Sequence, residues 1–323
     1  MSADAGRQEG KGPTIVACDP WVDNFIRGIV PDCRIPPIWE TTEPIAMLRD
    51  QAADARIAVS WGGFPFDEAM IEALPALEFV QIVGSGYDGL DTAALARRGI
   101  PFATGGHTNS ADVADYAVAM AMAVRRDLLP SDDWVRSGRW SREGRAPIRR
   151  SFSADRVGII GLGAIGQDIA MRLAGFGMQI RWWGPREKPG ERLPRAESLS
   201  ALAQWATILF ACCPLLPETD RLVDAGIFDA LGPEGIYVTV ARGAVTDEDA
   251  LIAALREGRL GGAGLDVFAQ EPTPPERWAD VPNILLSPHH AGVSIESQDR
   301  MRADVAENIR RFLAGETPKY LAG

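Results

Sequence analysis

Short apolar runs alternate with segments of helical periodicity in the first third of the chain. Three runs have the length and composition of buried strands: Thr14–Cys18, Ile57–Ser60 and Phe79–Val83. Helices are expected in the segments that follow them, beginning near Trp21, Asp67 and Asp91. This alternation predicts an α/β domain with a parallel sheet.

A second series of runs follows a long helix rich in alanine and methionine, expected at Asn109–Arg126 with Asn109 or Ser110 as its N-cap. Six runs in this series have the character of strands: Arg156–Gly161, Met178–Trp183, Thr207–Ala211, Ile236–Val240, Gly261–Asp266 and Ile284–Ser287. Helical segments lie between most of them. The pattern therefore predicts a second, doubly wound parallel sheet.

Two further segments carry distinct patterns. An amphipathic helical pattern begins near Val293 and has no strand after it, so we expect this helix to pack on the first domain; its apolar positions are Met301, Val305, Ile309 and Phe312. Arg136–Ser153 is rich in Arg, Gly and Ser and contains Trp140, which predicts a long loop.

Length and charge narrow the classes of protein. The 323 residues suggest about two domains, and a formal charge of -11 with a pI near 4.9 argues against nucleic acid and anionic lipid as partners. The longest apolar stretch, Tyr116–Val124, falls short of the ~20 residues that span a bilayer. With no signal sequence visible, we expect a cytoplasmic protein without membrane contact. The four cysteines have neither disulfide nor zinc spacing, so no metal is expected.

A glycine-rich motif follows the strand that begins the second series. Its spacing is G-x-G-x-x-G, and a helix is expected directly after it. Gly161 permits a tight turn, Gly163 lets a pyrophosphate approach the backbone, and Gly166 allows the helix to pack closely on the strand. Together with the intervening Ala164 and Ile165, these residues predict a dinucleotide site in which the helix N-terminus binds the phosphates.

The next strand ends without the carboxylate that usually binds the ribose hydroxyls of NAD. Gly184 stands at its tip, and Arg186 and Lys188 follow. Because arginine commonly binds phosphate, this turn predicts recognition of a 2′-phosphate and therefore NADP, with NAD as the alternative coenzyme. The other interpretation of the two cations is an ordinary solvated basic turn.

Three later strands end in polar side chains that could take part in chemistry. Arg242 follows one strand, Asp266 and Glu271 follow the next, and the pair His289–His290 follows the last. The carboxyl ends of parallel strands meet at one edge of a sheet, where open α/β folds bind their ligands.

These segments, in their order, resemble the D-isomer-specific 2-hydroxyacid dehydrogenases, which include glyoxylate and hydroxypyruvate reductases. The resemblance runs from about Ala58 to Phe312 and rests on the glycine motif, A-R-G-A-V-x-D, L-D-V-F-x-x-E-P and S-P-H-H-A-G. It implies a Rossmann dinucleotide domain at residues 108–292, inserted into a flavodoxin-like substrate domain of residues 1–107 and 293–323. The active site would lie in the cleft between the two domains.

The resemblance also assigns a catalytic set. The family's Arg-Glu-His residues fall on Arg242, Glu271 and His289. His289 would donate a proton to the carbonyl oxygen of a 2-oxo acid, while Glu271 would raise the pKa of the ring and fix its tautomer. Arg242 would bind the substrate carboxylate and polarise the carbonyl. His290 and His107 are expected to be structural and loop residues.

Further contacts follow from the same resemblance. The glycine-rich turn at Gly84, Ser85 and Gly86 matches the family's substrate-carboxylate loop, although an ordinary turn has the same composition. Asp266 matches a residue that contacts the nicotinamide, but it could equally be a hydrogen-bonded cap. Ala241 is assigned to the coenzyme site.

The favoured function is therefore the NADPH-dependent reduction of a small 2-oxo acid, such as glyoxylate or hydroxypyruvate, to the D-2-hydroxy acid. One alternative is an NAD-linked dehydrogenase of another D-2-hydroxy acid. The other is a non-catalytic, nicotinamide-sensing corepressor-like protein, which the short acidic chain disfavours. The resemblance further implies a homodimer formed through the dinucleotide domain, with Trp140 placed to reach the partner's active site.

Overall fold

A computed structural model describes residues 12–322 and divides the chain into two compact units. Unit 1 takes the chain up to Asn109 and again from Ser294, and unit 2 is Ser110–Val293. Each unit contains one sheet that is wholly or mostly parallel, so both are α/β domains.

The sheet of unit 1 has the order β1-β2-β3-β4-β11. Its first four strands are parallel, and the last pairs antiparallel with β4. The strands are β1 (Ile15–Ala17), β2 (Ile57–Trp61), β3 (Phe79–Val83), β4 (Phe102–Ala103) and β11 (Leu321–Ala322). The three strands predicted from the apolar runs are confirmed, whereas the two-residue β4 and β11 are too short to show in the sequence pattern.

A single residue completes the doubly wound order of unit 1. The Ile15 N–H donates to the Arg34 carbonyl at 2.9 Å, so Arg34 lies beside β1 on the side away from β2. Pro36 and Pro37 follow it and supply no N–H groups, which prevents a longer strand. The strand order thus reverses between β1 and β2, as in flavodoxin-like sheets.

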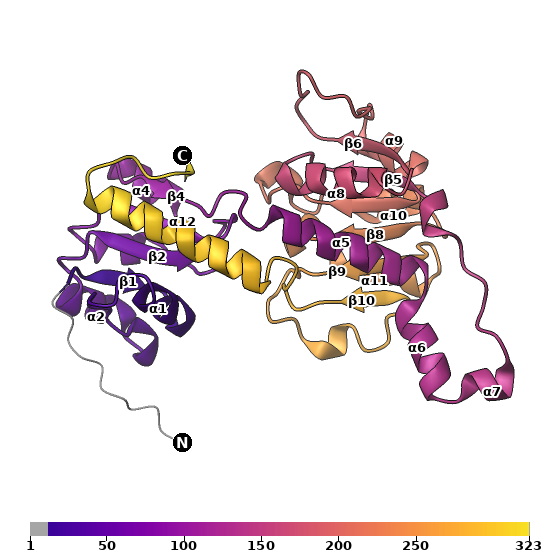
Figure 1. The fold of residues 1–323 in the computed structure, drawn as a ribbon, viewed down its shortest axis with the longest axis horizontal. Coiled ribbons are helices and arrows are strands. Elements are labelled where there is room, and N and C mark those ends of the chain that lie inside the picture. Colours follow the sequence, from indigo (N-terminus) through magenta and orange to yellow (C-terminus); the bar gives the residue numbers. More distant parts are fainter. Residues whose placement is uncertain (1–11, 323) are drawn as a thin grey trace. The chain divides into compact units, whose positions relative to one another are not determined.

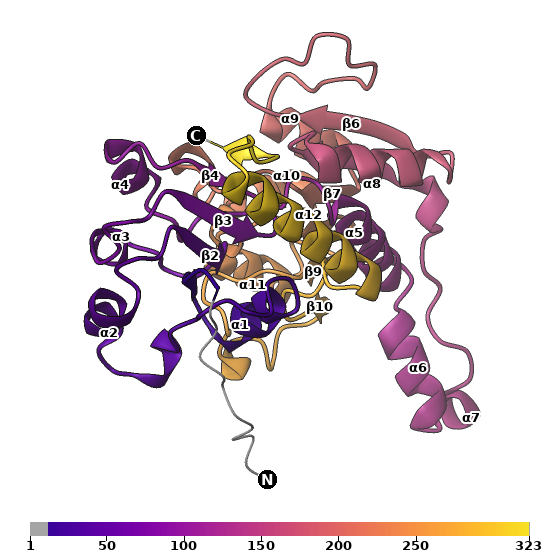
Figure 2. The ribbon, with the colours of Figure 1, turned by 60° about the vertical axis from the view of Figure 1, so that its left-hand side comes forward.

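Helices cover both faces of this sheet, as Figures 1 and 2 show. On one face lie α1 (Pro20–Arg27) and α12 (Ile295–Leu313); on the other lie α2 (Pro44–Gln51), α3 (Glu68–Glu72) and α4 (Thr92–Arg97). The expected packing of the C-terminal helix on this domain is confirmed, because its apolar stripe joins the core around Phe79. The α12 residues in this core are Met301, Val305 and Ile309.

Unit 2 contains a six-stranded parallel sheet in the order β10-β9-β8-β7-β5-β6. All six predicted strands are confirmed: β5 (Arg156–Ile160), β6 (Gln179–Trp183), β7 (Ile208–Ala211), β8 (Ile236–Thr239), β9 (Gly262–Leu265) and β10 (Ile284–Leu286). Arg195 forms a lone parallel bridge with Trp182 of β6 and stands where a dinucleotide fold has its third strand. The order reverses between β5 and β7, which is where such folds bind nucleotides.

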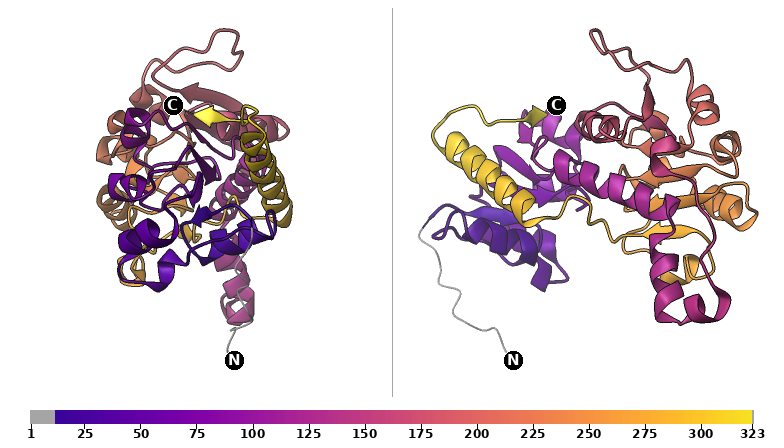
Figure 3. Two further views of the ribbon diagram at one scale, coloured as in Figure 1. Left: turned by 90° about the vertical axis from the view of Figure 1, so that its left-hand side faces the viewer. Right: turned by 45° about the vertical axis from the view of Figure 1, so that its right-hand side comes forward.

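Helices of unit 2 also lie on both faces of their sheet. One face packs against α5 (Ser110–Arg125) and α8 (Ala164–Ala174). The other packs against α9 (Leu199–Trp205), α10 (Ala225–Leu231) and α11 (Glu248–Arg256), the last two drawn in orange in Figure 3. Short 3-10 turns occur at Ile38–Glu40, Phe152–Ala154, Pro217–Thr219, Gly243–Val245 and Pro275–Arg277.

The segment after α5 differs from the expected long loop. Two short helices, α6 (Leu128–Arg136) and α7 (Arg139–Glu143), extend away from the sheet of unit 2 (Figures 1 and 3). Arg139 pairs with Glu143 at 3.0 Å and stacks over the Trp134 ring at 3.7 Å. These contacts stabilise a helical turn that the composition did not reveal, and irregular chain follows it from residue 144 to 151.

Candidate active site

The glycine-rich turn connects β5 to α8 at the point where the strand order reverses. Gly161 has φ +87°, and a Cβ there would lie 2.9 Å from the backbone of Cys213, two residues beyond β7. A Cβ on Gly166 would lie 2.3 Å from the Gly161 carbonyl oxygen, so the helix packs directly on the turn. No atom lies within 4 Å of a Cβ built on Gly163, which leaves space for a ligand.

The start of α8 suits a pyrophosphate. Gly163 is its N-cap, and no acidic side chain lies in its first turn. The backbone N–H groups of Ala164 and Ile165 have no partners inside the helix, because the first turn of any helix lacks them. The Lys188 ammonium donates a hydrogen bond to the Leu162 carbonyl within the turn, which adds positive charge beside the start of α8.

Cations also surround the tip of β6. The Arg195 guanidinium donates to the Gly184 carbonyl at 2.7 Å, and Arg186 is exposed in the turn that follows the strand. The carboxylate of Glu191 is turned toward its own loop, where it accepts hydrogen bonds from backbone N–H groups. The sequence missed Arg195, since nothing in its neighbours indicates that the chain returns to β6 there.

His289 and Glu271 form a close pair beyond the ends of β10 and β9. His289 Nδ1 and Glu271 Oε2 are 2.7 Å apart, and Glu271 Oε1 accepts from the Phe268 N–H at 2.9 Å. Burial raises the pKa of Glu271, but the hydrogen bonds from His289 and Phe268, with the charges of His289 and Arg242, lower it below its ordinary value. An ionised Glu271 only accepts hydrogen bonds, so it binds the Nδ1–H and leaves Nε2 for a ligand.

Asp266 holds the backbone around this histidine. His289 has φ +52°, and its N–H donates to the Asp266 carbonyl at 2.8 Å. The two carboxylate oxygens accept from the N–H groups of His290 and Ala291, at 2.8 and 3.0 Å. The structure thus shows the hydrogen-bonded cap considered for Asp266, and its contact with the nicotinamide stays a prediction. His290 is held through its backbone.

Arg242 lies on a turn that packs against the backbone leading to Glu271. A Cβ on Gly243 would lie 1.8 Å from the carbonyl carbon of Phe268, so only glycine fits there. The Arg242 guanidinium donates to the Ala241 carbonyl at 2.7 Å. The structure therefore brings Arg242, Glu271 and His289 to one edge of the unit 2 sheet, and sequence reasoning missed Gly243 as the residue that permits it.

The predicted substrate loop lies at the carboxyl edge of the unit 1 sheet. Gly84 has φ +92°, and its carbonyl accepts from the Gly105 N–H at 2.5 Å. In a trans peptide the N–H points opposite to the carbonyl, so the Ser85 N–H faces away from Gly105. The Ser85 hydroxyl donates to the Gly106 carbonyl, which fixes the turn. His107 is exposed in the loop that follows.

Comparison with known proteins decides the family. Residues 118–291, more than half of the chain, match the model of the D-isomer-specific 2-hydroxyacid dehydrogenase NAD-binding domain. The chain belongs to this family. It is an NAD(P)-dependent 2-hydroxyacid dehydrogenase or reductase, and the resemblance noted in the sequence is confirmed.

Several relatives of this dehydrogenase are similar over most of their length. A 2-ketogluconate reductase of Gluconobacter oxydans is 36% identical over 84% of this chain and 87% of its own. A glyoxylate/hydroxypyruvate reductase of Arabidopsis thaliana is 36% identical, covering 86% and 89%. The solved NADPH-dependent glyoxylate/hydroxypyruvate reductase of Sinorhizobium meliloti, in complex with NADP and malonate, has a TM-score of 0.86 at 30% identity, covering 96% and 97%.

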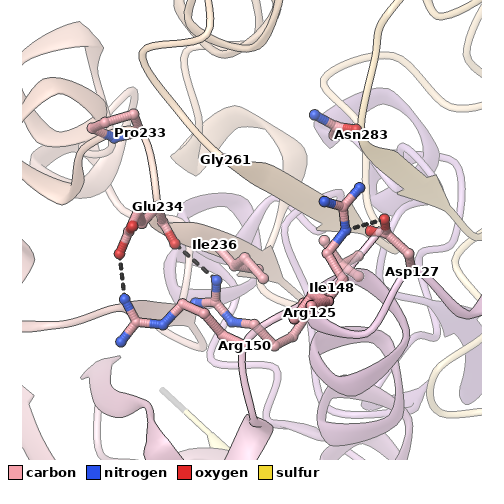
Figure 4. A pocket seen from close by; sticks show the side chains of 11 residues that line it. Arg125, Asp127, Ile148, Arg150, Pro233, Glu234, Ile236, Gly261 and Asn283 are labelled. Carbon is pink, nitrogen blue, oxygen red and sulfur yellow. Dashed lines mark hydrogen bonds and ion pairs between the residues drawn. The ribbon is translucent and has the colours of Figure 1, made fainter. Parts of the chain in front are cut away.

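A cavity of about 280 Å³ lies at the opposite edge of the unit 2 sheet of the dehydrogenase, near the amino ends of its strands (Figure 4). Each of its charged side chains has an ion-pair partner, although Asp155, the partner of Arg125, does not line the cavity. Arg125 binds Asp155 at 2.7 Å, and Arg150 pairs with Glu234. The first pair joins the end of α5 to the start of β5, and the second joins the chain before β5 to the chain before β8, so the cavity belongs to the framework of the domain.

Residues 12–322 of the dehydrogenase contain neither a side-chain cluster suited to a metal ion nor a helix suited to a membrane. In that part of the chain, no three His, Cys, Asp or Glu side chains gather in a way that could hold a metal ion. No helix within the same range is both long and apolar enough to cross a membrane.

Proposed function

We propose that this dehydrogenase reduces a small 2-oxo acid, of the glyoxylate or hydroxypyruvate type, to the D-2-hydroxy acid with NADPH. The observation that carries the proposal is the 2.7 Å contact between His289 and Glu271, with Arg242 on the adjoining turn. Unit 2 would bind the coenzyme, and unit 1 would bind the substrate carboxylate through Gly84, Ser85 and Gly86. Relatives named for glyoxylate and hydroxypyruvate reduction support this substrate class.

The proposed reaction needs a proton donor and a cation, because hydride addition places negative charge on the carbonyl oxygen. The nicotinamide, when bound, supplies the hydride. His289 donates the proton from Nε2, while the Glu271 carboxylate stabilises the charged ring through Nδ1. Arg242 binds the substrate carboxylate with its planar fork and attracts the developing charge on the oxygen.

The coenzyme proposal is tested by comparing NADPH with NADH. We expect a higher kcat/KM with NADPH, because Arg186 and Arg195 place positive charge at the β6 tip where the 2′-phosphate would lie. Arg186→Ala should lose most of this preference, by about 10- to 100-fold in affinity, since charge-assisted hydrogen bonds contribute about 1.5–3 kcal/mol. The kcat should barely change, because the contact is remote from the hydride.

Arg192→Ala is the matched control for that experiment. It removes one exposed cation from the same segment between β6 and α9. Steady-state kinetics with one 2-oxo acid and both coenzymes should leave its preference intact. Equal or better efficiency of the wild-type protein with NADH would refute the proposed coenzyme.

We also propose a homodimer formed through unit 2. Neither α6 nor α7 buries a residue, yet large apolar side chains are exposed on and near them. These are Leu128, Leu129, Val135, Trp140 and Ile148, with Trp140 60% and Ile148 97% exposed. Apolar side chains gathered in this way are typical of protein interfaces, and Trp140 would then be placed to reach the partner's active site.

Sedimentation at micromolar concentration tests the assembly. The wild-type chain should sediment as a dimer, and Leu129→Glu should weaken association because it places a charge in the apolar surface. Ile295→Glu is the control, since this apolar residue is 79% exposed on unit 1. A monomeric wild-type protein would exclude the proposed dimer.

A further inference from the structure

Two consecutive backbone N–H groups beside the candidate active site are bound by two different glutamates. The Phe268 N–H donates to Glu271 at 2.9 Å, and the Ala269 N–H donates to Glu248 at 2.7 Å. Glu271 in turn contacts His289. The backbone of Phe268 and Ala269 is therefore held on one side by the proposed catalytic pair and on the other by a residue from α11.

Glu248 is a charged residue in a buried position. Its side chain is only 5% exposed, although it carries a charge, and it comes from the first turn of α11. Arg277 balances it with a contact of 2.9 Å and also reaches the exposed Asp249 at 2.8 Å. A buried carboxylate is costly and need not stabilise a fold better than an apolar residue of similar size. Its presence here favours a role in geometry.

The backbone that Glu248 binds is also where the Arg242 turn packs. Gly243 fits against the carbonyl of Phe268 and the nitrogen of Ala269, with no room for a side chain. A shift of Ala269 would therefore move the turn that carries Arg242 together with the backbone that binds Glu271. Errors of about 1 Å in such an arrangement can cost roughly 100-fold in rate.

We infer that Glu248 is a positioning residue, which keeps Glu271 against His289 and Arg242 by binding the Ala269 N–H. This inference rests on the catalytic assignment proposed above. The charged groups around the set are Arg242 on the side of Glu271, and Arg277 with Asp249 on the side of Glu248. Glu248 itself touches neither substrate nor coenzyme in this account.

Two conservative variants distinguish the contribution of the length of the Glu248 side chain from that of its charge. Glu248→Asp keeps the charge but is one methylene too short for the Ala269 N–H, whereas Glu248→Gln keeps the reach and loses the charge. The proposed reduction needs an ionised Glu271, whose pKa is lowered by its hydrogen bonds with His289 and Phe268, and displacement of Glu271 would weaken these bonds and raise that pKa. In Glu248→Asp we expect kcat to fall about tenfold and the acidic limb of the pH–rate profile to move to higher pH. Glu248→Gln should change less in both measures.

Asp249→Asn is the control, because it removes the other carboxylate on Arg277 without touching Ala269. Rates are divided by the concentration of coenzyme-binding sites, so that a loss of folded protein cannot imitate the effect. An unmoved limb in Glu248→Asp, or a larger shift in Glu248→Gln, would overturn the inference. Should His289→Ala keep its activity in the same assay, the catalytic assignment itself would fail instead.

Discussion

Replacing His289 by alanine is expected to lower turnover with a 2-oxo acid at least ~100-fold, because a positioned general acid typically contributes 10²–10⁴. The structure sharpens this expectation, since His289 is the histidine paired with Glu271, at 2.7 Å. Its ring is 45% exposed and therefore accessible to a ligand. The measurement is kcat at saturating coenzyme and substrate.

His290→Ala is the control for this result, because the neighbouring histidine is held through its backbone N–H by Asp266. The loss of its ring should have a far milder effect on turnover. Equal impairment of the two variants, or the reverse order, would show that His289 is not the proton donor.

Arg242→Lys is expected to cost about 10- to 100-fold in kcat/KM, although it keeps the positive charge. A lysine cannot reproduce the two parallel hydrogen bonds of the guanidinium fork to a carboxylate, and such charge-assisted bonds contribute about 1.5–3 kcal/mol. Since the same group attracts charge on the carbonyl oxygen, we expect kcat to fall as well as KM to rise.

Arg256→Lys provides the comparison, because this arginine is exposed at the end of α11. It should behave as the wild type in the same kinetic assay. A normal kcat/KM in Arg242→Lys would mean that the carboxylate of the substrate is bound elsewhere.

The sequence predicted the central strands because each is an apolar run long enough to be buried on both faces. It could not predict Arg34 and Arg195 as bridging residues, since one backbone pair leaves no hydrophobic pattern. The same limit applies to α7, which depends on the contact of Arg139 with Glu143 and on its stacking over Trp134.

In the candidate site, too, the sequence predicted some residues and not others. The sequence motifs predicted Arg242, Glu271 and His289 as the catalytic set, because these residue types can bind a carboxylate and transfer a proton. The sequence did not single out the residues that hold these three side chains in place. Gly243 matters through a backbone contact, and Glu248 through a hydrogen bond to Ala269, which lies 21 positions away in the chain. Such contacts arise only when separate strands end at the same edge of a sheet.

The most direct test of the account is the oxidation of NADPH by the wild-type protein with glyoxylate, hydroxypyruvate, pyruvate and phenylpyruvate, followed by the absorbance of the reduced nicotinamide. We expect turnover with glyoxylate or hydroxypyruvate at a higher kcat/KM than with phenylpyruvate, and a D-2-hydroxy acid as the product of hydroxypyruvate. Tight binding of the coenzyme without turnover of any of these acids would contradict the proposed reduction.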